Sequence, residues 1–366
     1  MHLLNKRCTL FVFFSYLCSV KQDGLYIAFA PLQGYTDAAY RRAHWECAGG
    51  VGEYYTPFVR IEKGEVRRKD LRDTDPETNR GVPTVPQVIA RDGDELARLC
   101  DALQAQGWRR IDVNIGCPFP LQVHAGRGSG LLQHPDKLHE LLAEMQRRPE
   151  VAFSVKMRLG QECTDEGLRA LETVNRMPLC HVTLHARLGR QQYKGTPDLE
   201  AFKYFAEHCV HPMVYNGDAE VQLGVKSYEL RVMADADGND SNKSNKLLQA
   251  LPNRKGVMIG RGLLARPWML SEREPKEVLW AMHERLYRHA TQTLCGDSQV
   301  LARMKAFWEY IDLEQALSAG WQPTPQDSQA GSLRSTKVRK AIMKATTLAR
   351  YREAVSMAKG KPFCDR

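Results

Sequence analysis

The sequence predicts an α/β fold, a (β/α)8 TIM barrel followed by a smaller all-helical C-terminal domain. Short apolar or β-branched runs recur up to about residue 260, and amphipathic helical patterns lie between them. This alternation is typical of parallel strands, and eight strand-helix units over about 240 residues fit a closed barrel better than an open sheet. After about Glu272 the strand patterns stop, and only helical patterns follow.

Seven of the eight expected strands come from clear runs, and the eighth, over Val51–Thr56, comes from a weaker one. In the first helical pattern, over Asp94–Gln106, the residues Leu96 and Leu99 fall on one face. The clear strands are Leu25–Ala30, Thr84–Ala90, Arg110–Ile115, Ala152–Met157, His181–His185, Pro212–Asn216 and Gly256–Gly260. Further barrel helices are expected over Pro135–Arg147, Asp165–Arg176 and Asp198–His208.

The C-terminal part is expected to be helical and basic. Its patterns predict helices over Lys276–Thr293 and Val300–Ala319, a Pro/Gln/Ser-rich loop over Gln322–Ser332, and a basic helix from Ser335. The polar residues 232–245 predict a surface insertion before the last barrel helix.

These patterns divide the chain into an N-terminal extension (1–22), a catalytic barrel (23–271) and a helical domain (272–366). The extension holds an apolar run over residues 10–18 behind Lys6 and Arg7, which resembles a signal peptide and is too short to span a bilayer. Because the rest of the chain has the features of a cytoplasmic protein, we expect the extension to be disordered or to lie upstream of the true start.

Positive charge is concentrated near the C-terminal end of the 366-residue chain, whose net charge is +9. Residues 251–366 hold 20 basic and 11 acidic side chains, whereas residues 1–250 hold 32 of each kind. Charge segregated in this way indicates a polyanion-binding module attached to a neutral body. A solvated basic helix is the alternative explanation.

The composition, with 43% hydrophobic and 26% charged residues, excludes collagen, coiled coil and disorder of the whole chain. The ten cysteines include no C-x-x-C pair and no zinc-type spacing. This favours a reducing, cytoplasmic location and predicts no metal site. We also expect a monomer that does not bind membranes.

Polar and charged residues follow the predicted strands, at the end of a parallel barrel where active sites lie. Lys156 and Arg158 share one face of a strand, because side chains two positions apart point the same way. A lysine that faces into a barrel needs an anionic partner. Gly-rich turns after the last two strands, with Arg261 adjacent, are typical of a barrel phosphate site. The sequence therefore predicts a phosphate-bearing cofactor; a structural ion pair at Lys156 and a core histidine at His185 are the alternatives.

Eight short stretches of the sequence occur in a distinctive order. They are APLQGYTD, VPQVIA with Gln87, VNIGCP, GSGLL, VKMRLG, LHARLGRQQYKG, VYNGD and VMIGRGLLARPW. From about residue 25 to its C-terminus, the sequence therefore resembles the tRNA-dihydrouridine synthases, a family of flavoenzymes. The match is specific because all the stretches occur in the family's order.

The resemblance implies that the protein binds FMN, takes hydride from NADPH, and reduces the C5=C6 bond of a tRNA uridine to give 5,6-dihydrouridine. By position, Cys117 would be the proton donor, and Asn114, Arg158 and Arg187 would contact the RNA near the target base. The basic helices would bind the RNA backbone through Arg334, Lys337, Arg339 and Lys340. The flavin would contact Pro31, Leu32, Gln33, Gln87, Lys156, His185, Asn216, Gly217, Asp218, Gly260 and Arg261.

A cysteine suits the role of proton donor, because a thiol pKa of about 8.5 leaves it mostly protonated at neutral pH. Lys156 placed against Cys117 would make it a thiolate, so Lys156 is expected to face the N1/O2 edge of the flavin instead. The target base must leave its stack to reach the mouth of a barrel.

The chain departs from the family pattern at three places, one of which is the polar insertion over 232–245, longer than usual for the family. Leu32 and Gln33 stand where the family often has alanine or methionine, and Ala186-Arg187-Leu188 stands where Gly-Arg-Thr is common. These departures leave open which uridine is modified; the choice between NADPH and NADH is open because the chain has no dinucleotide fingerprint. Two other functions stay open at this point: another FMN barrel that acts on pyrimidines, such as a dihydroorotate dehydrogenase, and a non-catalytic RNA-binding barrel.

Overall fold

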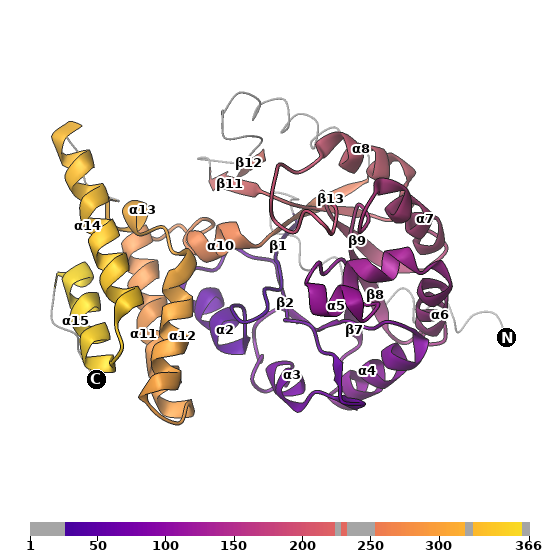
Figure 1. Cartoon of the computed structure of the whole chain (residues 1–366), viewed down its shortest axis with the longest axis horizontal. Coiled ribbons are helices and arrows are strands. Elements are labelled where there is room, and N and C mark those ends of the chain that lie inside the picture. The colour runs from indigo at the N-terminus through magenta and orange to yellow at the C-terminus, as the bar shows by residue number, and fades with distance from the viewer. Residues whose placement is uncertain (1–25, 224–227, 233–252, 319–324, 361–366) are drawn as a thin grey trace. The chain divides into compact units, whose positions relative to one another are not determined.

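The computed structural model describes residues 26–223, 228–232, 253–318 and 325–360 (Figure 1). The predicted extension over 1–22 and nearly all of the predicted insertion over 232–245 lie outside these residues. The chain forms two compact units, which are described separately. The first comprises the residues up to Gln33 together with Val51–Gly260, and the second comprises Gly34–Gly50 together with the residues from Arg261.

The first unit contains the predicted parallel barrel. Its sheet has the strand order β5-β2-β1-β13-β10-β9-β8-β7-β6, and every pairing is parallel. The two outer strands, β5 (Thr84–Val85) and β6 (Gln87–Val88), are halves of one run interrupted at Pro86, so the sheet closes on itself. The break has a simple cause, since proline has no N–H to donate to a ladder. The remaining strands are β1 (Tyr26–Phe29), β2 (Glu53–Tyr55), β7 (Arg110–Ile115), β8 (Ala152–Arg158), β9 (Leu179–His185), β10 (Met213–Asn216) and β13 (Arg254–Ile259).

Helices follow the strands and surround the sheet (Figure 1). Asp92 caps α4 (Gly93–Ala105), whose buried face carries the predicted residues Leu96 and Leu99 together with Leu103. A hairpin of β11 (Ala219–Leu223) and β12 (Tyr228–Val232) follows β10 and was not predicted. The helices of this unit are α3 (Arg68–Asp73), α4 (Gly93–Ala105), α5 (Pro120–His124), the 3-10 helix η1 (Gly128–Gln133), α6 (Pro135–Gln146), α7 (Thr164–Val174) and α8 (Leu199–His208).

The register of the strands decides which side chains share a level inside the barrel. In parallel pairs, aligned residues point to the same face. Asn114 aligns with Lys156, which aligns with Thr183 on β9. One level further along, Arg158 aligns with His185, which aligns with Asn216. These two levels lie toward the carboxyl ends of the strands, so the expected site residues meet there.

The opposite end of the barrel is closed by a second set of polar side chains. The Glu53 carboxylate accepts hydrogen bonds from the hydroxyls of Tyr26 (2.6 Å) and Tyr55 (3.2 Å). It also pairs with Arg110 at 2.7 Å. The Tyr55 hydroxyl in turn contacts Nε2 of His181 at 3.1 Å. Because each of these groups has a partner, this end of the barrel is a structural network.

The second unit is helical. Its α2 (Ala38–Cys47) packs on α11 (Pro275–Thr293). At the two ends of α2, Asp37 pairs with Arg303 and Glu46 pairs with Arg285. The expected loop over Gln322–Ser332 was wrong in its C-terminal part, because α14 begins at Pro325, a favoured first residue of a helix. The unit contains α2, α10 (Arg261–Ala265), α11 (Pro275–Thr293), α12 (Asp297–Tyr310), α13 (Leu313–Ser318), α14 (Pro325–Lys344) and α15 (Leu348–Lys359). In the described part of the chain, no helix combines the length and the apolar character that crossing a membrane would require.

Candidate active site

A chain of hydrogen bonds connects the loop of Cys117 to a buried carboxylate. The backbone N–H of Cys117 donates to Oδ1 of Asn114 at 2.8 Å, and Nδ2 of Asn114 donates to Oε1 of Gln87 at 2.7 Å. Nε2 of Gln87 then donates to Asp112 at 2.7 Å, and the hydroxyl of Ser154 donates to the other Asp112 oxygen at 2.6 Å. Every donor points toward Asp112, so this carboxylate sets the orientation of both amide side chains.

Asp112 was missed by the sequence analysis. It is fully buried, and burial raises the pKa of its carboxyl to about 6, although its hydrogen bonds and Lys156 oppose that rise. The signal was present, because Asp112 stands two residues before Asn114 and therefore on the same face of a strand whose other face is apolar.

Lys156 is a half-buried cation without a bonded partner. Among the described residues, it has no hydrogen bond or ion pair, and burial together with nearby Arg158 lowers the pKa of its amine to about 8. Beside it, the hydroxyl of Thr183 is buried and has no hydrogen-bond partner in the described part of the chain. Buried polar groups are normally satisfied, so this level of the barrel is suited to receive an anionic or polar ligand.

Arg158 and Arg187 are buried and hold loops together. Arg158 donates to the carbonyls of Gly116 (3.0 Å) and Leu188 (2.9 Å), and its guanidinium lies 5.5 Å from the centroid of the Tyr193 ring. Arg187 donates to the carbonyl of Gly195 at 2.7 Å and pairs with Asp218. The two arginines therefore fix the turns that follow β8 and β9. Tyr193 is an exposed aromatic residue in this region that the sequence analysis did not select.

The Cys117 thiol is half-buried and free. Burial raises its pKa, although the backbone N–H of Phe119 and the cations Lys156 and Arg158 oppose that rise. A thiol with a raised pKa stays protonated at neutral pH and can act as a proton donor, as the sequence analysis required.

The peptide of Cys117 is clamped by the glycine-rich turn. Its carbonyl accepts hydrogen bonds from the N–H and the hydroxyl of Ser129, both at 3.0 Å. Gly128 has a φ of +59°, and a Cβ atom added there would lie 2.5 Å from the Cys117 carbonyl oxygen. A glycine is therefore required at this position both for its backbone conformation and for its close approach.

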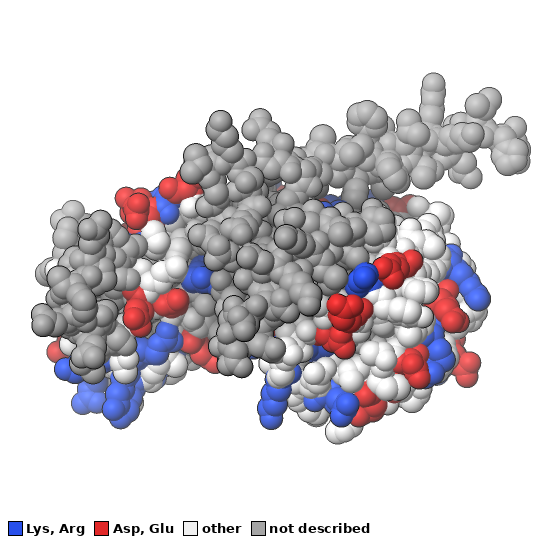
Figure 2. All heavy atoms as spheres, turned by 90° about the horizontal axis from the view of Figure 1, so that it is seen from above, with Lys and Arg blue, Asp and Glu red and all other residues white. Residues whose placement is uncertain are grey.

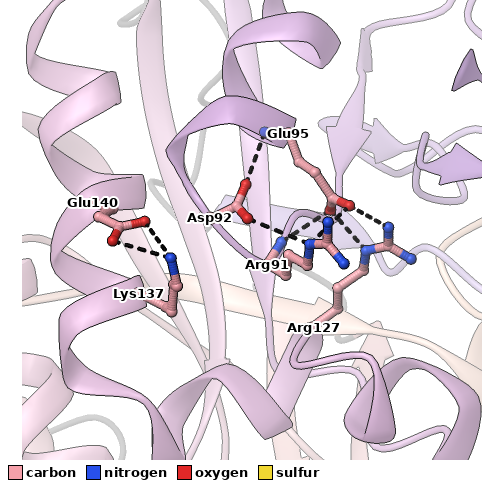
Figure 3. A network of polar contacts seen from close by, with 6 residues as sticks. All are labelled: Arg91, Asp92, Glu95, Arg127, Lys137 and Glu140. Carbon is pink, nitrogen blue, oxygen red and sulfur yellow. Dashed lines mark hydrogen bonds and ion pairs between the residues drawn. The ribbon is translucent and has the colours of Figure 1, made fainter. Parts of the chain in front are cut away.

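An ionic network ties this turn to helix α4 (Figure 3). Glu95 accepts hydrogen bonds from Nε (2.8 Å) and from a terminal nitrogen (2.5 Å) of Arg127, the residue before Gly128. Arg91 also pairs with Glu95, and Asp92 accepts the Glu95 N–H at 2.9 Å. Because Arg127 and Glu95 are nearly buried, the pair is a rigid anchor rather than a surface ion pair.

The residues expected at the phosphate end lie at the carboxyl ends of β1, β10 and β13 or directly after them. Nδ2 of Asn216 donates to the carbonyl of Met258 at 2.7 Å, which joins β10 to β13. Gly260 leaves a space that an added Cβ would fill, 3.4 Å from the Ala30 side chain and 3.7 Å from that of Leu32. Pro31 is half-buried, Gln33 is exposed, Gly217 directly follows Asn216, and Arg261 is the first residue of α10.

The family model for dihydrouridine synthase matches residues 28–307. The chain belongs to the dihydrouridine synthase family. A probable tRNA-dihydrouridine synthase of Rhizobium leguminosarum bv. phaseoli is 27% identical over 250 residues, which cover 66% of this chain and 69% of the relative. tRNA-dihydrouridine synthase B of Shewanella oneidensis is 25% identical, with 66% of this chain and 69% of the relative covered. The tRNA-dihydrouridine(16) synthase of Neisseria meningitidis serogroup A is 26% identical, with 66% and 68% covered.

Family membership confirms the activity that the sequence predicted: the synthase is an oxidoreductase that reduces uridines of tRNA to dihydrouridine. Family membership therefore excludes the two alternative functions, a dihydroorotate dehydrogenase and a non-catalytic RNA-binding barrel. Relatives with different positional names match at similar identity, so the similarity alone selects no single uridine. Among the described residues, no group of three or more His, Cys, Asp or Glu side chains is arranged to hold a metal ion.

The basic residues of the synthase's C-terminal helices have different surroundings. Lys337 and Lys340 are exposed and lie three residues apart, on one side of α14. Arg339 instead donates to the carbonyls of Trp308 and Glu309, both at 3.0 Å, and so binds the end of α12. The side chain of Arg334 lies outside the described residues. Figure 2 shows blue side chains gathered at one end of the helical unit, whereas blue and red alternate over the barrel.

Proposed function

We propose that the synthase binds FMN at the open level of the barrel, uses NADPH as reductant, and protonates the target uracil with Cys117. The observation that carries the proposal is the unpartnered amine of Lys156 beside the unpartnered hydroxyl of Thr183 in the described part of the chain, on the strand level next to Cys117. An anionic ring edge would satisfy both groups, and the space left by Gly260 suits the close approach of a phosphate. The side chains of Lys156 and Thr183 and the space at Gly260 therefore fit a bound FMN.

The roles of the side chains follow from their chemistry. Lys156, Gln87 and His185 would hold the ring system, and Asn114 and Arg158 would orient the uracil. The phosphate end would be held by Pro31, Leu32, Gln33, Asn216, Gly217, Asp218, Gly260 and Arg261.

A bound flavin reduced by NADPH supplies the hydride that uracil accepts at C6. The negative charge left on the uracil spreads over C5 and O4, and Cys117 donates its S–H proton to C5. Lys156 and Arg158, which already oppose the rise in the thiol pKa, would stabilise the thiolate that remains. Water must then return a proton to the sulfur before the next turnover.

The test compares Cys117→Ala with the unchanged protein. Both should show the same flavin absorbance and the same flavin reduction by NADPH, because the thiol takes no part in those steps. Dihydrouridine, measured by mass spectrometry of digested tRNA, should fall by roughly 100-fold or more in the variant. Normal product yield from Cys117→Ala would overturn the assignment, and a colourless protein that binds no added FMN would overturn the cofactor.

We further propose that the helical region over residues 272–366 binds the tRNA backbone through Lys337 and Lys340. Removal of one cation that binds a phosphate should lower the slope of log affinity against log salt by about 1. Lys337→Gln with Lys340→Gln should therefore lower this slope by about 2. Substitution of the exposed Arg147, which directly follows α6, by glutamine should leave the slope unchanged. Equal slopes for all three proteins would contradict the proposal.

A monomer in the reducing cytoplasm is also part of the proposal. The exposed free thiols of Cys163 and Cys295 support a reducing location. Light scattering of the purified protein and fractionation of cells test the two statements. Mapping dihydrouridine in tRNA from cells that lack the protein would identify the uridine.

A further inference from the structure

Two large apolar side chains are exposed in the segment that follows β7, Phe119 directly before the short helix α5 and Leu121 within it. Phe119 is 58% exposed and Leu121 is 71% exposed, and they lie only two and four residues after Cys117. Single exposed apolar residues are common on protein surfaces, so exposure alone implies nothing. Three further observations distinguish this pair.

The first observation is contact with the reactive sulfur. The backbone N–H of Phe119 lies close enough to the Cys117 thiol to oppose the rise in its pKa, so residue 119 forms part of the immediate surroundings of the sulfur. A pyrimidine ring that reaches the thiol therefore brings its neighbouring nucleotides close to Phe119.

The second observation is that the backbone holds both side chains in place. Pro118 and Pro120 flank Phe119, and its carbonyl accepts the N–H groups of Gln122 (2.8 Å) and Val123 (3.1 Å). The preceding peptide is clamped by Ser129, and the following turn is anchored through Arg127 and Glu95 (Figure 3). A contact surface that is already ordered loses little entropy on binding.

The third observation is the charge of the segment. Residues 117–134 contain no Asp or Glu, and they include the exposed His124 and His134, while the charge of Arg127 is already paired with Glu95. A polyanion can approach such a segment without repulsion between like charges, whereas a basic partner would find no acidic group within it.

We infer that Phe119 and Leu121 form a contact surface for the tRNA nucleotide next to the target uridine, with the Phe119 ring stacked on its base. This inference rests on the proposed role of Cys117. Extrusion of the target uridine breaks stacking with its neighbours, and a rigid aromatic ring beside the site replaces that stacking. The contact requires no particular base, because every base has a π face.

The experiment measures tRNA binding and turnover for Phe119→Ala, Phe119→Trp and Leu121→Ala. Phe119→Ala should weaken tRNA binding and raise KM for tRNA by roughly 5- to 100-fold. Phe119→Trp should keep most of the affinity, and Leu121→Ala should weaken it by a smaller factor. Flavin content and flavin reduction by NADPH should not change, and neither should the salt slope, because an apolar contact releases no counterions.

Val210→Ala is the matched control. Val210 is 69% exposed, but it lies before β10, toward the opposite end of the strands. Its substitution should change neither affinity nor turnover.

The outcomes are distinguishable. Wild-type protein without flavin-dependent uridine reduction would overturn the proposed function. An active wild type together with unchanged tRNA affinity in Phe119→Ala would overturn this inference alone. A change in self-association by sedimentation, with tRNA affinity unaltered, would assign the surface to a second copy of the chain and also overturn it.

Discussion

Replacement of Lys156 by methionine should stabilise the protein in the absence of flavin. Methionine keeps much of the length and the apolar stem of lysine but removes the charge. In the structure, this charge has no bonded partner among the described residues, and burial lowers the pKa of the amine from 10.5 to about 8. The fold therefore holds a cation that would be more stable in water.

The magnitude follows from the pKa. A change from 10.5 to about 8 corresponds to about 3 kcal/mol at 1.36 kcal/mol per pH unit. This value is an upper bound, because the side chain is only half-buried and solvent screens its charge. After this discount, we expect Lys156→Met to gain about 1–2 kcal/mol in the free energy of unfolding at pH 7.

The pH dependence has a definite sign. Below pH 8 the amine is charged in both the folded and the unfolded chain, so the penalty is fully present. As the pH rises from 8 toward 10.5, the folded chain releases its proton first, and the penalty disappears. The advantage of the methionine variant should therefore shrink across this range.

The assay is denaturant unfolding of flavin-free wild type and Lys156→Met at pH 7 and pH 9.5. Other groups that titrate in this range are common to both proteins and cancel in the difference. If the proposed flavin site is correct, the same variant should bind FMN at least about tenfold more weakly, because it lacks the cation that would face the ligand. If Lys156→Met is less stable than wild type at pH 7, the lysine has a stabilising partner in the fold, and the reasoning fails.

Three further predictions concern the parts that support the site. Thermal melts should show a larger loss of stability for Gly128→Ala than for Gly64→Ala. Both glycines have a positive φ, which costs an alanine about 1–2 kcal/mol, but only at residue 128 would the added Cβ also lie against a backbone oxygen. Equal losses would contradict the close approach at Gly128. A double-mutant cycle of Glu95→Ala and Arg127→Ala, measured by urea unfolding, should give a coupling energy of about 1–3 kcal/mol. If the two single-variant losses in the free energy of unfolding simply add, the pair does not stabilise the turn. Burial lowers the pKa of His181 from 6.5 to about 4, so the wild type should lose stability as the pH falls from 6.5 to 4, and His181→Gln should lose less; parallel curves would contradict this.

The sequence predicted those parts of the site that depend on alternation along a strand. The spacing of Lys156 and Arg158 placed both on one face, and the register with Thr183 and His185 confirms it. Strand ends were predicted to within a few residues, because apolar runs and turn residues mark them. The run over Thr84–Ala90 was correctly expected to be extended, but Pro86 divides it into two short strands.

Contacts between distant segments were not predictable from the same patterns. Nothing in the local sequence indicates that Arg127 meets Glu95, which lies 32 residues earlier. The direction of the hydrogen-bond chain that ends at Asp112 is likewise a tertiary property, because it depends on which amide faces which strand. The helix from Pro325 was missed because its Pro, Gln and Ser residues are also typical of loops.

The polar side chains at the two ends of the barrel interior differ in whether they have partners, and this difference locates the ligand site. Strand β9 points His181, Thr183 and His185 into the barrel, and these residues pass from one end of it to the other. At the first end, His181 contacts the Tyr55 hydroxyl at 3.1 Å and the Lys255 amine at 3.2 Å, so its polar atoms are satisfied within the fold. Two residues on, the Thr183 hydroxyl has no partner in the described part of the chain, and the same is true of the Lys156 amine aligned with it. A fold selected only for stability would satisfy or remove both groups, since an unpartnered buried hydroxyl costs about 1–3 kcal/mol and the half-buried Lys156 cation is also destabilising. The unmatched polarity is therefore best explained by a ligand that the fold is built to receive.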